Sequence, residues 1–138
     1  MTTLLTGTYK LAAFEASIDG SDWRSLFGPS PRGYAVITPS RFIAVLTGQD
    51  RKAGRTTEER AALFDSLCAY TGRYRLEGDK FITSVDTSWN EAWNGTDQLR
   101  TWALAGSRLS LLTEPAPSPF NPSQTAVFRV VWEKATQA

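Results

Sequence analysis

The chain has 138 residues, of which 41% are hydrophobic and 21% charged, and its formal net charge is +1. These values predict one ordinary globular domain over residues 1–138 and exclude a strongly basic nucleic-acid-binding surface. No apolar run is long enough for a membrane span, and the start MTTLLTGTYK lacks the pattern of a signal peptide. We therefore expect a cytoplasmic protein that binds neither nucleic acid nor membrane.

Histidine is absent, and Cys68 is the only cysteine. This composition excludes an intrachain disulfide and every Ser-His or Cys-His catalytic pair, and it argues against a histidine- or cysteine-ligated metal. The segment GPSPRG lacks the Lys-Ser/Thr pair of a phosphate-binding loop. We expect no metal and no cofactor. Chemistry would then depend on carboxylates, tyrosines, lysines, arginines or backbone groups.

Alternation of polar and apolar residues predicts eight strands along the chain. The expected strands are Gly7–Glu15, Tyr34–Thr38, Arg41–Thr47, Thr71–Leu76, Phe81–Thr87, Asp97–Leu104, Leu109–Thr113 and Thr125–Trp132. If they run up and down, the tight turns near residues 39, 78 and 106 fall at one end and the long connections at the other. This arrangement predicts an all-β, eight-stranded antiparallel β-barrel with one pinched end and one open end.

One helix is predicted over about residues 57–69. Thr56 and Glu59 form a capping box, and Leu63, Phe64, Leu67 and Cys68 form an apolar stripe. Because this helix lies in a long connection, we expect it to cap the open end of the barrel. Its apolar face could instead support a homodimer, as could an outer face of the sheet.

Polar residues gather at the expected open end. Counting along the strands places Glu15, Tyr34, Tyr70, Asp86, Gln98 and Arg100 there, with Tyr9, Leu104 and Trp132 near the pinched end. The stretch TSWNEAWNGTDQLR joins two of the strands through a corner rich in Trp, Asn and Gly. This gathering of polar side chains predicts a ligand-binding cavity at the open end.

The position of Asp86 depends on the pairing of two strands. If Asp86 opposes Gln98, then Ser84 opposes Arg100 and Asp86 faces the interior with Arg100. If the register slips by one, Val85 opposes Arg100 and Asp86 lies outside. We favour the first register slightly.

Several residues are candidates for binding or catalysis. Glu15 and Asp86 are candidate acids or bases, and Arg100 is a candidate anchor for a carboxylate, carbonyl or enolate. Candidate ligand-binding residues are Tyr34, Tyr70, Tyr74, Trp89, Gln98, Arg100 and Trp102. Structural alternatives are a rim carboxylate in water for Glu15, a structural arginine bonded to Glu15, Asp86 or carbonyls across the barrel for Arg100, and packing for the aromatic residues.

Several segments resemble the bacterial lipocalin-like domain family from about residue 5 to residue 134. They are GTY at the start, FGPSPRGY, YTGRY, and above all SWNEAWNGTDQLR followed by GSRLSLLT. The resemblance implies a small antiparallel barrel with an internal cavity. Glu15, Asp86, Gln98 and Arg100 match family positions, whereas Thr83 and Ser84 stand where members often carry two histidines, Glu91 replaces a usual proline, and Tyr9 replaces a usual tryptophan.

Three functions remain possible from the sequence. The first is binding of one small hydrophobic molecule bearing a carbonyl or acidic group, oriented by Arg100 and Gln98. The second is a cofactor-independent isomerase, cyclase or lyase for a polyketide-like or other carbonyl substrate, in which Glu15 or Asp86 moves a proton. The third is a structural or partner-binding barrel whose interior is filled.

Overall fold

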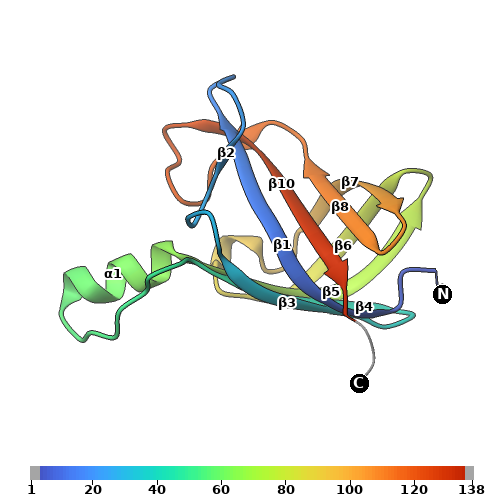
Figure 1. Cartoon of the computed structure of the whole chain (residues 1–138), viewed down its shortest axis with the longest axis horizontal. Coiled ribbons are helices and arrows are strands. Elements are labelled where there is room, and N and C mark those ends of the chain that lie inside the picture. Colours follow the sequence, from blue (N-terminus) through green and yellow to red (C-terminus); the bar gives the residue numbers. More distant parts are fainter. Residues whose placement is uncertain (1–3, 136–138) are drawn as a thin grey trace.

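The strands of the computed structural model, which describes residues 4–135, form a closed antiparallel barrel (Figure 1). Closure comes from β1, which pairs with β3 on one side and with β10 on the other. The barrel strands are β1 (Gly7–Ile18), β3 (Arg32–Ile37), β4 (Arg41–Thr47), β5 (Leu67–Glu77), β6 (Lys80–Ser88), β7 (Asp97–Ala105), β8 (Arg108–Thr113) and β10 (Thr125–Lys134). The expected eight-stranded barrel is confirmed.

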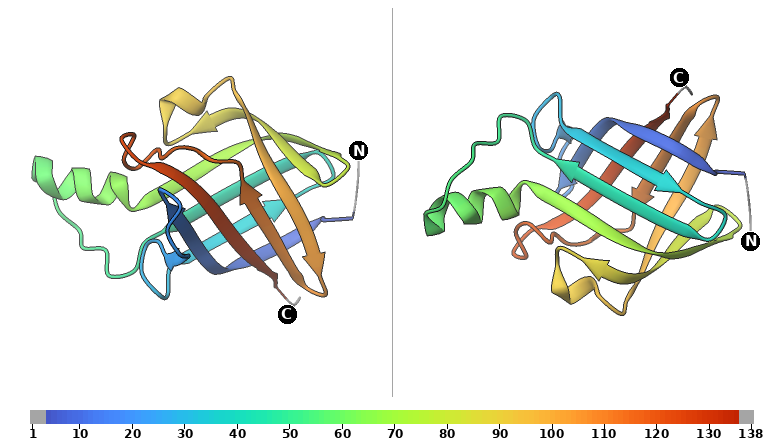
Figure 2. Two further views of the ribbon diagram at one scale, coloured as in Figure 1. Left: turned by 90° about the horizontal axis from the view of Figure 1, so that it is seen from above. Right: turned by 90° about the horizontal axis from the view of Figure 1, so that it is seen from below.

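Four smaller elements lie in the long connections between barrel strands. They are β2 (Arg24–Ser25), β9 (Ala116–Pro117), the helix α1 (Thr57–Asp65) and the short 3-10 helix η1 (Glu91–Trp93). The short turns β3–β4, β5–β6 and β7–β8 lie at the opposite end of the barrel from these elements, as Figure 2 shows. The barrel therefore has the predicted closed end and elaborated open end.

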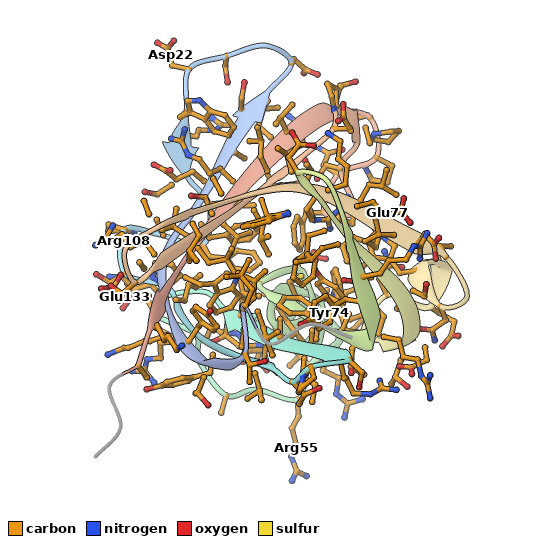
Figure 3. All side chains as sticks on the ribbon, turned by 90° about the vertical axis from the view of Figure 1, so that its right-hand side faces the viewer. Asp22, Arg55, Tyr74, Glu77, Arg108 and Glu133 are labelled. Atoms are coloured by element: carbon orange, nitrogen blue, oxygen red, sulfur yellow. The ribbon has the colours of Figure 1, made fainter. Side chains whose placement is uncertain are left out.

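The closed end is filled with side chains. Leu5 and Tyr9 are buried there, and the Tyr9 hydroxyl donates a hydrogen bond of 2.9 Å to the Leu5 carbonyl. Trp132, Phe42 and Phe81 are also buried almost completely. Figure 3, seen from the side of the tight turns, shows Tyr74 among the interior side chains and Glu77, Arg108 and Glu133 around the edge.

A bulge in β1 reverses which residues face inward. Leu11 opposes Trp132 and Ala13 opposes Val131, so Ala12 is an extra residue without a counterpart in β10. Tyr9 and Leu11 are buried before the bulge, and Phe14 is buried after it. Because side chains alternate along a strand, one extra residue exchanges the inner and outer faces. The predicted orientations of the β1 residues beyond Ala12 are therefore inverted.

The pairing of β6 with β7 differs from both expected registers. Phe81 opposes Arg100 and Thr83 opposes Gln98. The corner after β6 fixes this register, because the backbone N–H of Val85 donates to the Thr96 carbonyl at 2.9 Å. Phe81 and Val85 belong to the main core cluster, whereas Ile82, although buried, does not, so the inward residues of β6 are the odd-numbered ones.

Helix α1 does not cap the barrel. It ends at Asp65, and none of its residues is buried. Figures 1 and 2 show it projecting away from the barrel. The expected capping box is confirmed, since Thr56 accepts from the Glu59 N–H and the Glu59 side chain accepts from the Thr56 N–H.

The expected end of the helix near residue 69 is wrong because the segment from Leu67 onward is a strand. It pairs with β4, beginning with Leu67 opposite Thr47. Cys68, Tyr70 and Gly72 are buried while the residues between them are less so, a period of two rather than 3.6. Gly72 is required here, since a Cβ at this position would collide with the Ser84 carbonyl oxygen of β6.

None of the helices described over residues 4–135 has the length and apolar character to cross a membrane.

Candidate functional site

An apolar cavity lies in the half of the barrel toward the open end. Its volume is about 40 Å³. The apolar side chains that line it come from strands all around the barrel and include Phe14, Phe42, Leu46, Leu111, Phe128, Val130 and Trp132. Polar groups enter its wall at Arg100, Tyr70, Thr113 and Cys68. The cavity is therefore mainly apolar, with a few polar groups in its wall.

Phe120 closes the mouth above this cavity. It belongs to the connection between β9 and β10, and its ring centroid lies 5.3 Å from that of Phe27 and 6.0 Å from that of Phe128. Trp89 stacks on Phe120 at 6.0 Å and meets Trp93 edge-on at 5.0 Å. This aromatic cluster takes the place in which the helix was expected.

Arg100 is the cation in the cavity wall. Its Nη1 donates to the Leu99 carbonyl at 3.0 Å and to Gln98 Oε1 at 3.4 Å, and its guanidinium carbon lies 5.8 Å from the Trp93 ring centroid. None of the ion pairs formed among residues 4–135 includes Arg100. Of the structural partners considered for it, Glu15 and Asp86 pair with other arginines, whereas a carbonyl, that of Leu99, does accept from Arg100.

Tyr70 and Cys68 stay protonated at neutral pH. Burial raises the pKa of the Tyr70 phenol, and the nearby positive charge of Arg100 opposes this only in part. Burial likewise raises the pKa of the Cys68 thiol to about 12. Neither group is a base or a thiolate nucleophile near pH 7. Both instead offer neutral hydrogen-bonding groups next to an apolar space.

The sequence from residue 6 to residue 135 matches the model of a protein family described as a lipocalin-like domain. The chain belongs to this family. The match covers nearly the same residues as the resemblance drawn from the short motifs, and the closed barrel has the architecture that the resemblance implies. In a search of curated proteins, none matched the chain.

Within this lipocalin-like barrel, Glu15 lies on the outer face. Its Oε1 accepts hydrogen bonds of 2.9 Å from both Nε and Nη2 of Arg129, and the Arg129 guanidinium stacks on the Trp23 ring at 4.2 Å. The expected inward position was wrong because it assumed an unbroken alternation from Tyr9, and the bulge at Ala12 interrupts it.

Asp86 also lies outside the lipocalin-like barrel. It is exposed and pairs with Arg41, with 2.9 Å between Oδ2 and Nη1. The favoured register was wrong because Thr83, not Asp86, opposes Gln98. Asp86 is the extra residue of a bulge in the β5–β6 ladder, where Thr71 opposes Thr87 and Gly72 opposes Val85. The slipped register placed Asp86 correctly, although its pairs differ from the observed ones.

The expected ligand-binding residues separate into three groups. Tyr70 lines the cavity beside Arg100, and Gln98 lies next to Arg100 on the inner face of β7. Trp89 does not line the cavity but packs on Phe120 and Trp93, which do. Only Tyr70 and Arg100, of the expected set, contribute to the cavity wall directly.

The remaining three lie elsewhere in the lipocalin-like barrel. Tyr74 and Trp102 serve the closed end: the Tyr74 hydroxyl donates to the Thr38 carbonyl at 2.9 Å, and Trp102 Nε1 donates to the Gly78 carbonyl at 3.1 Å. Tyr34 is 55% exposed on the outer face of β3. These three residues do not line the cavity, since the Tyr74 hydroxyl and the Trp102 indole bind turns and Tyr34 faces water. The homodimer expected through an outer face stays a prediction.

Several cavity residues were missed from the sequence, above all Phe14, Phe120 and Phe128. Phe14 was missed because the β1 bulge changes which residues face inward. Phe128 was missed because the last strand is mostly apolar and shows no clear inward face. Phe120 could have been predicted from the sequence. It is the only aromatic residue in the proline-rich segment PAPSPFNP at the open end, and a large apolar side chain tends to be buried. No group of three or more His, Cys, Asp or Glu among residues 4–135 is placed to hold a metal ion.

Proposed function

We propose that this lipocalin-like barrel binds one small, mainly apolar molecule that carries a carbonyl or acidic group. The apolar part occupies the cavity, and the polar group meets the Arg100 guanidinium. The observation that carries this proposal is the combination of a largely apolar chamber with a cation in its wall that has no carboxylate partner among the described residues.

A partly buried guanidinium is costly to desolvate unless something compensates its charge. In this barrel the compensation comes from the Leu99 carbonyl, Gln98 Oε1, the Trp93 ring and the Tyr70 hydroxyl. These are neutral groups, so a negative charge or a strong dipole from a ligand adds the missing interaction. The planar fork of an arginine suits a carboxylate or carbonyl oxygen.

The size of the cavity limits the ligand. Its volume of about 40 Å³ is far below the roughly 300–1,000 Å³ of typical pockets for drug-sized molecules. A short chain or a small flat group fits without rearrangement. A larger ligand would have to displace Phe120, which lies in a connection rather than in a barrel strand.

The acid–base enzyme considered from the sequence loses its proposed base. Glu15 and Asp86 both pair with arginines on the outer face. No carboxylate lines the cavity among the described residues, and the cavity-lining Tyr70 and Cys68 have raised pKa values. Binding without chemistry is therefore the function that this geometry supports best.

The test compares hexanoate with hexan-1-ol by NMR chemical-shift titration of the ¹⁵N-labelled protein. Arg100→Gln should weaken hexanoate binding about tenfold or more, since hydrogen bonds to charged groups contribute about 1.5–3 kcal/mol. Hexan-1-ol affinity should change less than about twofold. Arg129→Gln is the matched control, because it removes an arginine from the outer face. Absence of saturable binding of both probes to the wild-type protein would overturn the proposal.

A further inference from the structure

A groove opens through the side of the barrel next to the cavity. Its volume is about 330 Å³, and it lies between the start of β7 and the segment that contains β9. One wall contains Asp97, Gln98 and Leu99, and the opposite wall contains Glu114 and Ala116. This lateral groove is more polar than the cavity.

The groove exists because two neighbouring strands separate. The β7–β8 ladder runs from Ala105 opposite Arg108 to Arg100 opposite Thr113. Beyond Thr113 the chain turns to β10, and Ala116 pairs with Ala126. Prolines at 115 and 117 lack the N–H needed to continue a ladder with β7. The start of β7 therefore pairs with β6 but not with β9, which leaves an opening in the barrel wall.

The groove and the cavity adjoin each other. Five residues line both spaces: Trp93, Arg100, Thr113, Pro119 and Phe128. Arg100 is the only cation among the residues that line either one. It therefore lies at the boundary between the apolar cavity and the more polar groove. An amphipathic molecule bound across this boundary would place its polar head group near Arg100.

The two carboxylates on the groove walls do not neutralise Arg100. Asp97 accepts a hydrogen bond of 2.8 Å from Ser84 Oγ, and its Oδ2 lies 3.5 Å from Nη2 of Arg75. Glu114 lies 3.6 Å from Nζ of Lys80. Each acid already has a cationic partner outside the groove, so the positive charge of Arg100 is left for an anion.

We propose that the lateral groove is the entrance to the cavity and that the ligand is a small amphipathic anion with a slender apolar tail. The tail passes between β7 and β9 into the cavity, and the carboxylate or similar group stays at Arg100 and faces the groove. This inference rests on the proposed function and adds the route and the charge of the ligand. The alternative route, through the mouth, runs past Phe120, whose ring packs against Phe27, Trp89 and Phe128.

The test measures binding rates as well as affinity. Ala116 lines the groove but not the cavity, so Ala116→Trp narrows the entrance without occupying the binding site. Association and dissociation rate constants for hexanoate are obtained by NMR line-shape analysis. Ala105→Trp is the matched control, because it makes the same change at the exposed β7–β8 turn of the closed end.

We expect Ala116→Trp to lower both rate constants at least fivefold while the dissociation constant changes less than threefold. Ala105→Trp should change neither rate. If the wild-type protein binds hexanoate and Ala116→Trp leaves both rates unchanged, the entrance is elsewhere and this inference is overturned while the proposed function stands. If hexan-1-ol binds as tightly as hexanoate, the anionic class is overturned. If neither probe binds, the proposed function itself fails.

Discussion

Arg100 and Thr113 face each other across β7 and β8, and both side chains border the cavity and the lateral groove. They are the last pair of this ladder before the strands separate. Thr113 also fixes the far wall, because its Oγ1 accepts a hydrogen bond of 2.9 Å from the backbone N–H of Phe128. The pair thus connects the opening in the barrel to the position of a cavity-lining aromatic residue.

Thr113→Val tests this role. Valine has the same shape but cannot accept the hydrogen bond, so the Phe128 N–H loses its partner. We expect the free energy of unfolding, measured by urea denaturation, to fall by about 1–3 kcal/mol. Thr87→Val on the exposed part of β6 should change it by less than about 0.5 kcal/mol. Equal effects of the two substitutions would contradict the assigned role of Thr113.

Deleting Ala12 should abolish stable folding. The deletion removes the β1 bulge, which turns Glu15 toward the apolar interior and Phe14 toward water. An unpaired carboxylate in such a place costs several kcal/mol. Deletion of Asp22 from an exposed loop is the control and should leave a cooperative thermal transition in circular dichroism. A similar transition in both variants would show that the bulge does not set the orientation.

The sequence predicted the barrel but not which side chains point into it. Strands and turns follow from local patterns, so the eight strands and the two unequal ends were predictable. Orientation depends on bulges and register: the extra Ala12 turns Glu15 outward, and the β6–β7 register, with Thr83 opposite Gln98, places Asp86 on the outer face. Neither feature has a clear local signal, since Ala12 is an ordinary residue in an otherwise regular alternation.

Arg100 lies in the cavity wall, and β7 has no bulge between its paired residues and the closed-end turn that would change its orientation. The helix was misread for a different reason. In the sequence, Leu67 and Cys68 continue the apolar pattern of the helix by chance. In the structure they belong to β5, where they pair with Thr47 and Leu46 of β4. Long-range pairing overrides local propensity here.

Helix α1 should be dispensable for binding. Thr47 and Leu67 are already paired, so a short Gly-Ser linker in place of residues 51–64 can connect β4 to β5. The main losses are the Arg51 hydrogen bonds to Ser66 and Leu63 and the contact of Phe64 with Trp89 at 6.4 Å. We expect hexanoate affinity to stay within about twofold in the NMR titration. A tenfold loss would show that the helix forms part of the site.

Stability should decrease in alkaline solution because of Cys68. Its pKa is about 12 in the folded protein against 9.0 for an ordinary thiol, so above pH 9 the unfolded chain loses a proton that the folded chain keeps. Stability is therefore complete below pH 9 and falls as the pH rises to 12, by up to about 4 kcal/mol. The measurement is the free energy of unfolding in urea as a function of pH.

Cys68→Ala is the control for this pH dependence. It should remove the decrease between pH 9 and pH 10, whatever its effect on stability at pH 7. Above pH 10 a decrease remains, because burial also raises the pKa values of Tyr9, Tyr70 and Tyr74 from 10.0. An unchanged slope between pH 9 and pH 10 would contradict the burial of the thiol in a protonated form.

The most direct measurement is an isotope-filtered NOE experiment on hexanoate bound to the ¹³C-labelled protein. The account predicts contacts from the terminal methyl group to Phe42 and Trp132 inside the cavity. It also predicts contacts from the methylene next to the carboxylate to Trp93 and Thr113 at the groove. Contacts in the reverse order, or only to outer-face residues such as Tyr34, would contradict a tail-in orientation anchored at Arg100.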